Sequence, residues 1–332
     1  MGIKRRAFLI GGATLIGGGA FALKWLDSSA ADDAVALTEG KGETSFGGWL
    51  KIGADDAITV YSPHADIGQG SNTALGQMLA EELDADWAKV DIIAAPAEKA
   101  FANTGLGQGF LGEMSGHPAI INALPVALLS FIARAMPLQI TGGSSALRFT
   151  GQRTMQVLGA ATRKALLETA AKRLAVPEEE LSTSQSKVIH SRSGKTLRYG
   201  ELAAEAAQRS LEDEPKLKDP KDYRLIGKPV ARIDTPAKVN GTMQYGIDVQ
   251  LPEMRVATIM AAPIRGGKLV SVDPAPAMAI KGVEKVIKLE SAVAVVAKGY
   301  WPALQGLRAL SPNFSDGGHG AISTASMISP MT

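Results

Sequence analysis

Apolar and polar positions alternate in the early part of the chain and then change to helical spacing. From Trp49 to Tyr61 the alternation runs on both sides of a Gly-Ala-Asp-Asp turn at 53–56, which predicts a β-hairpin. A glycine-rich loop at 68–70 follows, and an extended pattern returns at 90–93. Between them, these apolar residues have helical spacing: Leu75, Met78, Leu79 and Leu83. The unit is therefore predicted as strand, loop, helix and strand.

A second glycine-rich loop, at 141–145, comes before a longer amphipathic pattern. Apolar residues at helical spacing from 155 to 174 predict a helix that starts near Arg153, and a proline shortly afterwards helps to end it. A short hairpin is expected at 183–199, and a small helix is expected from Leu202.

A change in charge pattern separates this region from the rest. From 212 to 228 nearly every second residue is charged and two prolines intervene, so residues 211–229 are predicted as a linker. A small unit follows at 230–312, after the first region at 44–210. Its strands are expected at 244–249, 256–260, 283–289 and 292–297, and its short helices at 274–280 and 302–310. Residues 313–332 have no periodic apolar face. The fold class predicted is α+β.

The first residues have the layout of an export signal. Lys4, Arg5 and Arg6 precede an apolar stretch at 7–23 that contains five glycines, and a small, acidic segment completes a signal over residues 1–34. Adjacent arginines of this kind resemble the twin-arginine signal, which predicts the periplasm. An uncleaved anchor at the periplasmic face of the inner membrane is the alternative.

Composition narrows the classes of function. The 332 residues favour two domains, and the net charge of +2 gives no support for nucleic-acid binding. The absence of cysteine excludes a disulfide framework, a cysteine nucleophile and an iron–sulfur cluster bound by this chain. Glycine is frequent, 36 of 332 residues, which indicates loops that turn tightly or approach a ligand closely.

The first glycine loop is a candidate ligand site. A strand end, a loop with Gly68, Gln69 and Gly70, and a helix start would direct backbone N–H groups to one point, which suits an anion. The Gln69 amide and the Thr73 hydroxyl would add hydrogen bonds. A simple turn before a helix is the alternative.

The second loop has the same character. It consists of consecutive glycines flanked by hydroxyls, and a flexible surface loop is its alternative. Its residues are Thr141, Gly142, Gly143, Ser144 and Ser145. A third run, Gly107 to Gly112, matches the glycine spacing of dinucleotide-binding proteins but lacks the flanking strand, helix and acidic residue, so we reject a nucleotide-dependent dehydrogenase.

Histidines and carboxylates provide no clear catalytic or metal-binding set. The four histidines are not spaced to share a helix face or a strand, so no metal ligand of this chain is predicted. His64 lies near the first glycine loop, but a lone histidine at a strand end is more often structural. Glu81 and Glu82 lie on the predicted helix after that loop, and no catalytic residue is assigned.

Several longer strings resemble a known family. They are Ile67-Gly68-Gln69-Gly70 with Ala80-Glu81-Glu82-Leu83-Asp84, the loop at 141–145, Tyr223 to Pro229, Asp234 to Gly241 with Tyr245 to Val249, and Gly266-Gly267-Lys268 with 276–286. In this order the strings resemble the N-terminal part of the large subunit of a molybdenum hydroxylase. The family is that of xanthine dehydrogenase and aldehyde oxidase, and the branch is that of the isoquinoline 1-oxidoreductase β-subunit.

The resemblance implies a fold and a reaction. Residues 44–210 would form a molybdopterin-binding α/β region, and 230–312 an α/β hammerhead domain. The two glycine loops would hold molybdopterin, in its cytosine dinucleotide form, with its molybdenum. The reaction implied is hydroxylation of an aldehyde or an N-heterocycle with oxygen from water. Electrons would leave through iron–sulfur clusters of a small partner subunit, with a cytochrome as a candidate acceptor.

The chain also departs from the family. Large subunits of this branch are about twice as long, and no glutamate here matches the family's catalytic base. The resemblance therefore implies that a complementary C-terminal half of the large subunit is a partner. The alternative is a catalytically incomplete subunit with a structural or assembly role, or an exported protein that binds a small anion. The sequence does not indicate a function for the apolar stretch at 106–138.

Overall fold

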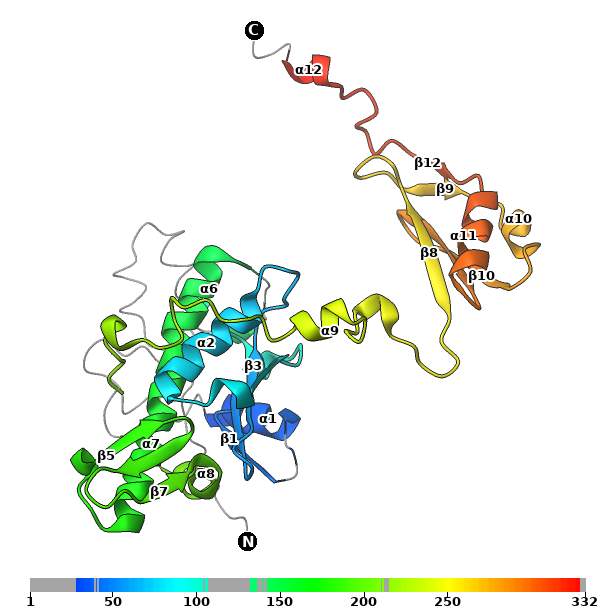
Figure 1. Ribbon diagram of the computed structural model, residues 1–332. Helices are drawn as coiled ribbons and strands as arrows, with labels where there is room; N and C mark the ends of the chain where they lie inside the picture. The colour runs from blue at the N-terminus through cyan, green and yellow to red at the C-terminus, as the bar shows by residue number, and fades with distance from the viewer. Residues whose placement is uncertain are drawn as a thin grey trace. The chain divides into compact units, whose positions relative to one another are not determined.

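The computed structural model describes residues 28–38, 40, 42–103, 105–106, 132–135, 139, 142–209, 211 and 215–328. The chain divides into two compact units, Met1–Met243 and Gln244–Thr332 (Figure 1). Both contain helices and sheets, which confirms the α+β class. No helix in these ranges is long and apolar enough to cross a membrane. The apolar stretch at 7–23 and the glycine run at 107–112 lie outside the described residues.

A four-stranded sheet forms one layer of the first unit. Its strands, in spatial order, are β1 (Glu43–Phe46), β2 (Leu50–Gly53), β3 (Ile58–Ser62) and β4 (Val90–Ala94). The first three are antiparallel, which confirms the predicted hairpin, whereas β3 and β4 are parallel. A parallel pair needs a crossover, and helix α2 (Ser71–Leu83), with the short 3₁₀ helix η1 (Trp87–Lys89), supplies it. The predicted order of strand, loop, helix and strand is confirmed.

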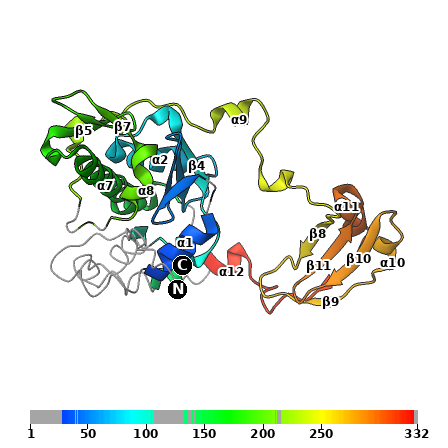
Figure 2. The ribbon, with the colours of Figure 1, turned by 90° about the horizontal axis from the view of Figure 1, so that it is seen from below.

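Helix α2 lies between the sheet and the long helix α7 (Gln156–Leu174), as Figure 2 shows. The two helices approach closely at Gly159, where an added Cβ would lie 2.4 Å from the carbonyl oxygen of Leu79. Helix α7 continues without a break from α6 (Ser144–Thr150) through a π-helical turn, Gly151–Met155. The helical segment therefore begins earlier than the expected start near Arg153.

Smaller elements complete the first unit. The sheet of β5 (Leu181–Ser184), β6 (Lys187–His190) and β7 (Thr196–Arg198) is antiparallel, and α8 (Tyr199–Ala206) follows it. Buried Tyr199 donates a hydrogen bond to the carbonyl oxygen of Leu83, 2.7 Å away, and so ties α8 to the end of α2. Two further short helices here are η2 (Lys99–Phe101) and η4 (Glu178–Glu180).

Two segments take part in the first unit beyond what the sequence indicated. Helix α1 (Ser28–Thr38) overlaps the end of the predicted signal, yet its Ala34 is buried in the core. Residues 215–234, which we call the strap, lie against helix α2, and their backbone N–H groups donate hydrogen bonds to side chains of that helix. Most of these residues were predicted as a linker. The strap includes η5 (Pro220–Asp222) and leads to α9 (Thr235–Val239).

The second unit is built on an antiparallel sheet with the order β10-β11-β8. These strands are β8 (Val256–Ala261), β10 (Val283–Lys288) and β11 (Ala292–Ala297), and the helices α10 (Ala275–Met278) and α11 (Tyr300–Ala309) pack against them. The other elements are η6 (Gly246–Asp248), α12 (Thr324–Ile328) and the pair β9 (Leu269–Ser271) and β12 (Asn313–Phe314). The strand expected at 244–249 is wrong, because this segment forms the 3₁₀ turn η6.

Candidate functional site

The two glycine loops singled out in the sequence lie against each other. The side-chain amide of Gln69 donates to the carbonyl oxygen of Gly142 at 3.1 Å, and also to that of Ala65 at 3.1 Å. Its carbonyl oxygen accepts the N–H of Ile67 at 2.7 Å. Gln69 therefore closes its own loop and joins it to the second one. Thr141 lies outside the described residues.

A carboxylate inside the first loop uses the N–H groups expected to face an anion. Asp66 accepts hydrogen bonds from the N–H of Gly68 at 2.8 Å and from that of Asn72 at 3.3 Å. Burial alone would raise the pKa of Asp66, but these N–H groups, that of Gly70 and the Arg232 charge outweigh burial, and the pKa is lowered. The loop thus contains its own anion. The signal in the sequence was an aspartate two residues before a glycine, a typical turn pattern.

The glycines leave open backbone on the outer side of both loops. A Cβ atom built at Gly68 or at Gly143 meets no atom of the described residues within 4 Å, and both residues are exposed. Gly68 has a φ of 108°, which favours glycine over any other residue. Ser144 is exposed and Ser145 half-buried at the start of α6. This open backbone is the part of the site where a ligand can approach closely.

Two hydroxyl groups in the first turn of α2 differ in their surroundings. The Ser71 side chain is buried, and its oxygen has no hydrogen-bond partner in the described part of the chain. Thr73 is also buried, but its hydroxyl accepts the N–H of Ile233 at 3.4 Å. Thr73 therefore contacts the strap, whereas the unpaired Ser71 oxygen is a polar atom that a bound group can satisfy.

Arg232 of the strap holds the first loop. Its Nη1 donates to the carbonyl oxygen of Gly68 at 2.9 Å, and its Nη2 lies 3.4 Å from a carboxylate oxygen of Asp66. The same guanidinium forms two hydrogen bonds with Asp234, at 2.9 and 2.7 Å. The hydrogen bonds from Arg232 lower the pKa of Asp234 well below its usual range. The conformation of the loop thus depends on residues far away in the sequence.

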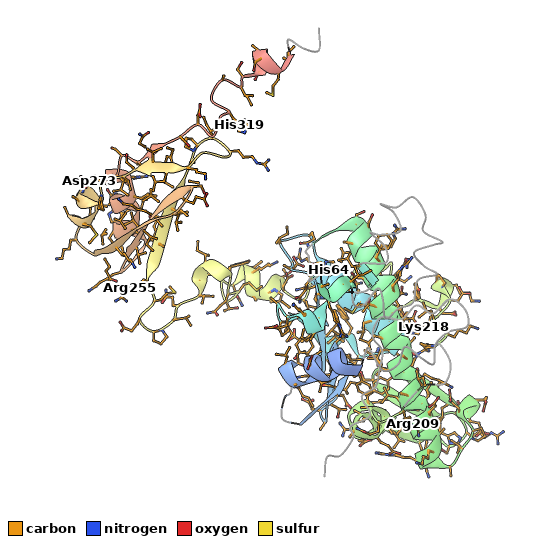
Figure 3. The ribbon with its side chains drawn as sticks, turned by 180° about the vertical axis from the view of Figure 1, so that it is seen from behind. His64, Arg209, Lys218, Arg255, Asp273 and His319 are labelled. Carbon is orange, nitrogen blue, oxygen red and sulfur yellow. The ribbon has the colours of Figure 1, made fainter. Side chains whose placement is uncertain are left out.

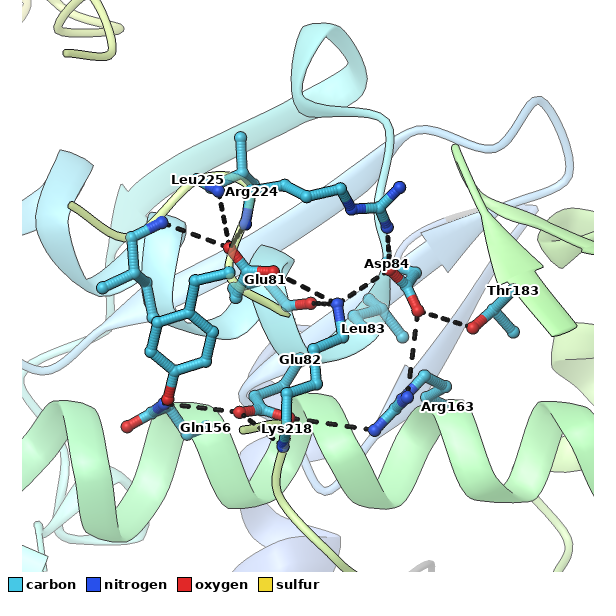
Figure 4. A network of polar contacts seen from close by, with 12 residues as sticks. Glu81, Glu82, Leu83, Asp84, Gln156, Arg163, Thr183, Lys218, Arg224 and Leu225 are labelled. Atoms are coloured by element: carbon cyan, nitrogen blue, oxygen red, sulfur yellow. Dashed lines mark hydrogen bonds and ion pairs between the residues drawn. The ribbon is translucent and has the colours of Figure 1, made fainter. Parts of the chain in front are cut away.

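The other end of the strap is held by a buried carboxylate of α2 (Figure 4). Glu81 accepts the backbone N–H groups of Arg224 at 2.7 Å and Leu225 at 2.5 Å, and Lys218 lies 3.2 Å away. Burial alone would raise the pKa of Glu81, but the N–H groups of Leu225 and its neighbours, together with Lys218, lower it. Glu81 is therefore an ionised anchor for the strap.

Glu82 and Asp84 extend this network toward α7. Glu82 is fully buried, accepts the N–H of Lys218 at 3.0 Å and lies 3.8 Å from Arg163. Burial raises its pKa despite these partners. Asp84 pairs with Lys218 at 2.8 Å and with Arg224 (Figure 4). The acidic residues at the end of α2, to which the sequence assigned no catalytic role, form a structural network inside the first unit.

A buried polar cluster lies next to the loops. His64 (Figure 3) has its Nε2 atom 2.7 Å from the hydroxyl oxygen of Thr150, which also accepts a hydrogen bond from Asn103 at 2.7 Å. His64 precedes the first loop and Thr150 ends α6, which follows the second loop. The cluster therefore connects the bases of both loops. Asn103 was missed in the sequence, since no motif surrounds it.

Side chains that could bind a metal ion do not gather around the loops. The described ranges contain no group of three or more histidine, aspartate or glutamate side chains that could hold a metal ion.

Comparison with known proteins identifies the class of the domain. Residues 26–124, which include the first glycine loop, match the molybdopterin cofactor-binding domain. Over 330 residues the chain is 30% identical to the beta subunit of the isoquinoline 1-oxidoreductase of Brevundimonas diminuta, covering 89% of this chain and 38% of that protein. The resemblance to molybdenum hydroxylase large subunits is thus confirmed: this chain contains a molybdopterin cofactor-binding domain and is homologous to such a subunit.

Two further relatives have related names. The chain is 29% identical over 283 residues to the membrane-bound aldehyde dehydrogenase [pyrroloquinoline-quinone] of Gluconacetobacter polyoxogenes, covering 81% of this chain and 32% of the relative. It is 27% identical over 259 residues to a nicotinate dehydrogenase subunit of Pseudomonas putida, covering 75% of this chain and 19% of the relative. The chain spans less than two-fifths of the length of each of these three relatives.

Proposed function

We propose that the chain is the molybdopterin-binding part of an oxidoreductase subunit that hydroxylates aldehydes or N-heterocycles with oxygen from water. The observation that carries this proposal is the hydrogen bond between Gln69 and Gly142, which joins the two glycine loops and supports a single site within or next to the matched domain. The names of the relatives, an isoquinoline oxidoreductase, a nicotinate dehydrogenase and an aldehyde dehydrogenase, support the two substrate classes.

The residues of the site fit the cofactor in a specific way. The exposed backbone at Gly68 and Gly143 allows close approach, and the Ser71 oxygen, which has no partner among the described residues, offers a hydrogen bond. Because the loop N–H groups already bond to Asp66, we assign contact with the cofactor to this outer backbone, to the Ser144 and Ser145 hydroxyls and to the Thr141 segment. When bound, molybdopterin supplies the molybdenum centre that takes two electrons from the substrate.

The partners belong to the same proposal. This chain has no cysteine, so the iron–sulfur clusters that receive the electrons are assigned to a small partner subunit, with a cytochrome as a further acceptor. The rest of the large subunit supplies the catalytic base and the remaining cofactor contacts. We also propose the cytosine dinucleotide form of the cofactor, a hammerhead fold for residues 230–312, and twin-arginine export to the periplasm.

The direct test is cofactor analysis of the assembled protein. The chain is produced together with the rest of the large subunit and the small iron–sulfur subunit in a host that makes molybdopterin. We expect molybdenum and pterin in equal amounts, close to one per complex, and oxidation of an aldehyde or N-heterocycle with an artificial acceptor. An intact, soluble complex that contains neither molybdenum nor pterin contradicts the proposal.

A further inference from the structure

A side chain from a distant part of the first unit contacts its glycine loop. Arg232 reaches the Gly68 carbonyl oxygen and the Asp66 carboxylate, 164 and 166 residues away in the sequence. We propose that Arg232 is a positioning residue for the cofactor: it fixes the loop at 66–73 in the conformation that exposes the Gly68 backbone. This inference rests on the proposed function of the loop.

The geometry of the guanidinium supports a fixed orientation. Nε and Nη2 of Arg232 form a fork on the two carboxylate oxygens of Asp234, at 2.9 and 2.7 Å. Because the guanidinium is planar, these two hydrogen bonds also fix the direction of its remaining N–H donors. Nη1 then donates to the carbonyl oxygen of Gly68 at 2.9 Å. Asp234 is in turn paired with Lys238 at 2.6 Å, one helical turn further on.

The loop has a specific need for such a contact. Gly68 and Gly70 both have positive φ angles, so in the absence of contacts their backbone has many accessible conformations. The Asp66 carboxylate is 7% exposed, and Arg232 is the cation that balances its charge in the described part of the chain. Without Arg232, a poorly solvated carboxylate would favour loop conformations that expose it to water.

The position of Arg232 makes its effect local. The strap is anchored separately at Lys218 and Leu225 by Glu81, and Gln77 adds a hydrogen bond to the Leu225 carbonyl oxygen at 3.1 Å. These contacts lie toward the opposite end of α2 from the loop. Replacement of Arg232 should therefore release the loop while the rest of the strap stays in place.

Hydrogen exchange of the full complex tests the proposal. Arg232→Gln removes the charge and most donors, whereas Arg232→Lys keeps the charge without the fork. The matched control is Arg173→Gln, which breaks another partly exposed arginine–carboxylate pair of this unit, with Glu205 at 2.9 Å. In cofactor-free protein we expect exchange in the peptide at 66–73 to rise about tenfold in Arg232→Gln and to stay unchanged in the control.

Further readouts separate positioning from direct contact and from general instability. We expect exchange at 218–226 to be unchanged, pterin retention to fall several-fold in Arg232→Gln, and Arg232→Lys to recover little of either effect. Loss of pterin with unchanged exchange at 66–73 would overturn the proposal, since Arg232 would then contact the cofactor itself. Unchanged exchange and unchanged pterin would also overturn it. A wild-type complex without molybdopterin refutes the proposed function instead. The exchange rates of the cofactor-free protein still test whether Arg232 fixes the loop conformation.

Discussion

Gln69 and Gly142 are 73 residues apart in the sequence, and a hydrogen bond of 3.1 Å joins the amide of one to the carbonyl oxygen of the other. This bond joins two glycine loops for which a simple turn and a flexible surface loop were the alternatives to a ligand site. Because the same amide group also closes the first loop through Ile67 and Ala65, Gln69 determines both the shape of that loop and its place beside the second one.

Replacement of Gln69 should therefore weaken cofactor binding without unfolding the chain. For Gln69→Ala we expect a loss of about 0.5–1.5 kcal/mol in cofactor binding, because the loops lose a hydrogen-bonded junction that is exposed to solvent. Pterin released from the purified complex measures the effect. Gln208→Ala, an exposed glutamine of the same unit, is the control and should retain the wild-type pterin content. Equal retention in both variants would contradict the role of the junction.

A pair of glycines separates loss of ligand space from backbone strain. Gly68 and Gly194 both have positive φ angles, 108° and 68°, and within the part of the chain that the structure describes a Cβ at either meets no atom within 4 Å. Gly68→Val and Gly194→Val should each strain the backbone and lower the free energy of unfolding by about 1–3 kcal/mol, but only Gly68→Val should abolish cofactor retention. Thermal unfolding and pterin content of the two complexes are compared. Cofactor retained in Gly68→Val would remove this loop from the site.

The adjacent glutamates of α2 should have opposite effects on the dependence of stability on pH. The pKa of Glu81 is lower in the folded chain than in the unfolded chain. Ionised Glu81 therefore stabilises the fold at pH values above its pKa in the unfolded chain, and this stabilisation is lost as the pH falls through its pKa in the folded chain. The pKa of Glu82 is raised by burial, so ionisation of Glu82 reduces stability as the pH rises above the unfolded pKa.

Denaturant unfolding from acidic to neutral pH measures both contributions. Glu81→Gln should lower the free energy of unfolding at neutral pH by about 1–3 kcal/mol and have little effect at low pH. Glu82→Gln should lower the free energy of unfolding less at neutral pH than at low pH. At neutral pH the substitution also removes the free-energy penalty of a buried, ionised carboxylate. The same pH profile for both variants would show that the two carboxylates do not differ as described.

The close contact between α2 and α7 predicts that a single methyl group added at Gly159 destabilises the first unit. A Cβ at Gly159 would lie 2.4 Å from the Leu79 carbonyl oxygen and 3.0 Å from the Glu82 Cβ. Gly159→Ala should destabilise the first unit by about 1–3 kcal/mol through overpacking, despite the better helix propensity of alanine. Gly299→Ala is the control, since a Cβ there meets no atom within 4 Å in the described ranges. Unfolding midpoints that fall equally would contradict the close contact.

Local patterns in the sequence were sufficient for much of the fold. Strand β4 buries alternate residues, and the apolar residues of helix α2 have helical spacing, so both show clear periodicity. The strands of the hairpin are buried almost throughout, and the turn residues at 53–56 indicated them. Contacts between distant segments leave no such pattern. Lys218 and Arg224 looked like a solvated linker because their partners, Glu81 and Asp84, are more than 130 residues away. The segment at 244–249 has alternating apolar residues, but Gly246 and Asp248 favour the turn found there.

The candidate site was only partly predictable for the same reason. Glycines and hydroxyls indicated both loops, since close backbone approach needs these residue types. The role of Asp66 required the loop conformation, and the role of Arg232 required the path of the strap. Neither residue could be assigned from spacing alone.

The central claim is that both glycine loops hold one molybdopterin, and hydrogen exchange of the cofactor-loaded and cofactor-free complex tests it most directly. We predict that loading slows exchange at 66–73 and at 142–150 together, whereas the hairpin at 187–198 keeps its rate. Protection of neither loop, or of one loop alone, in a complex that demonstrably contains the pterin would contradict the account.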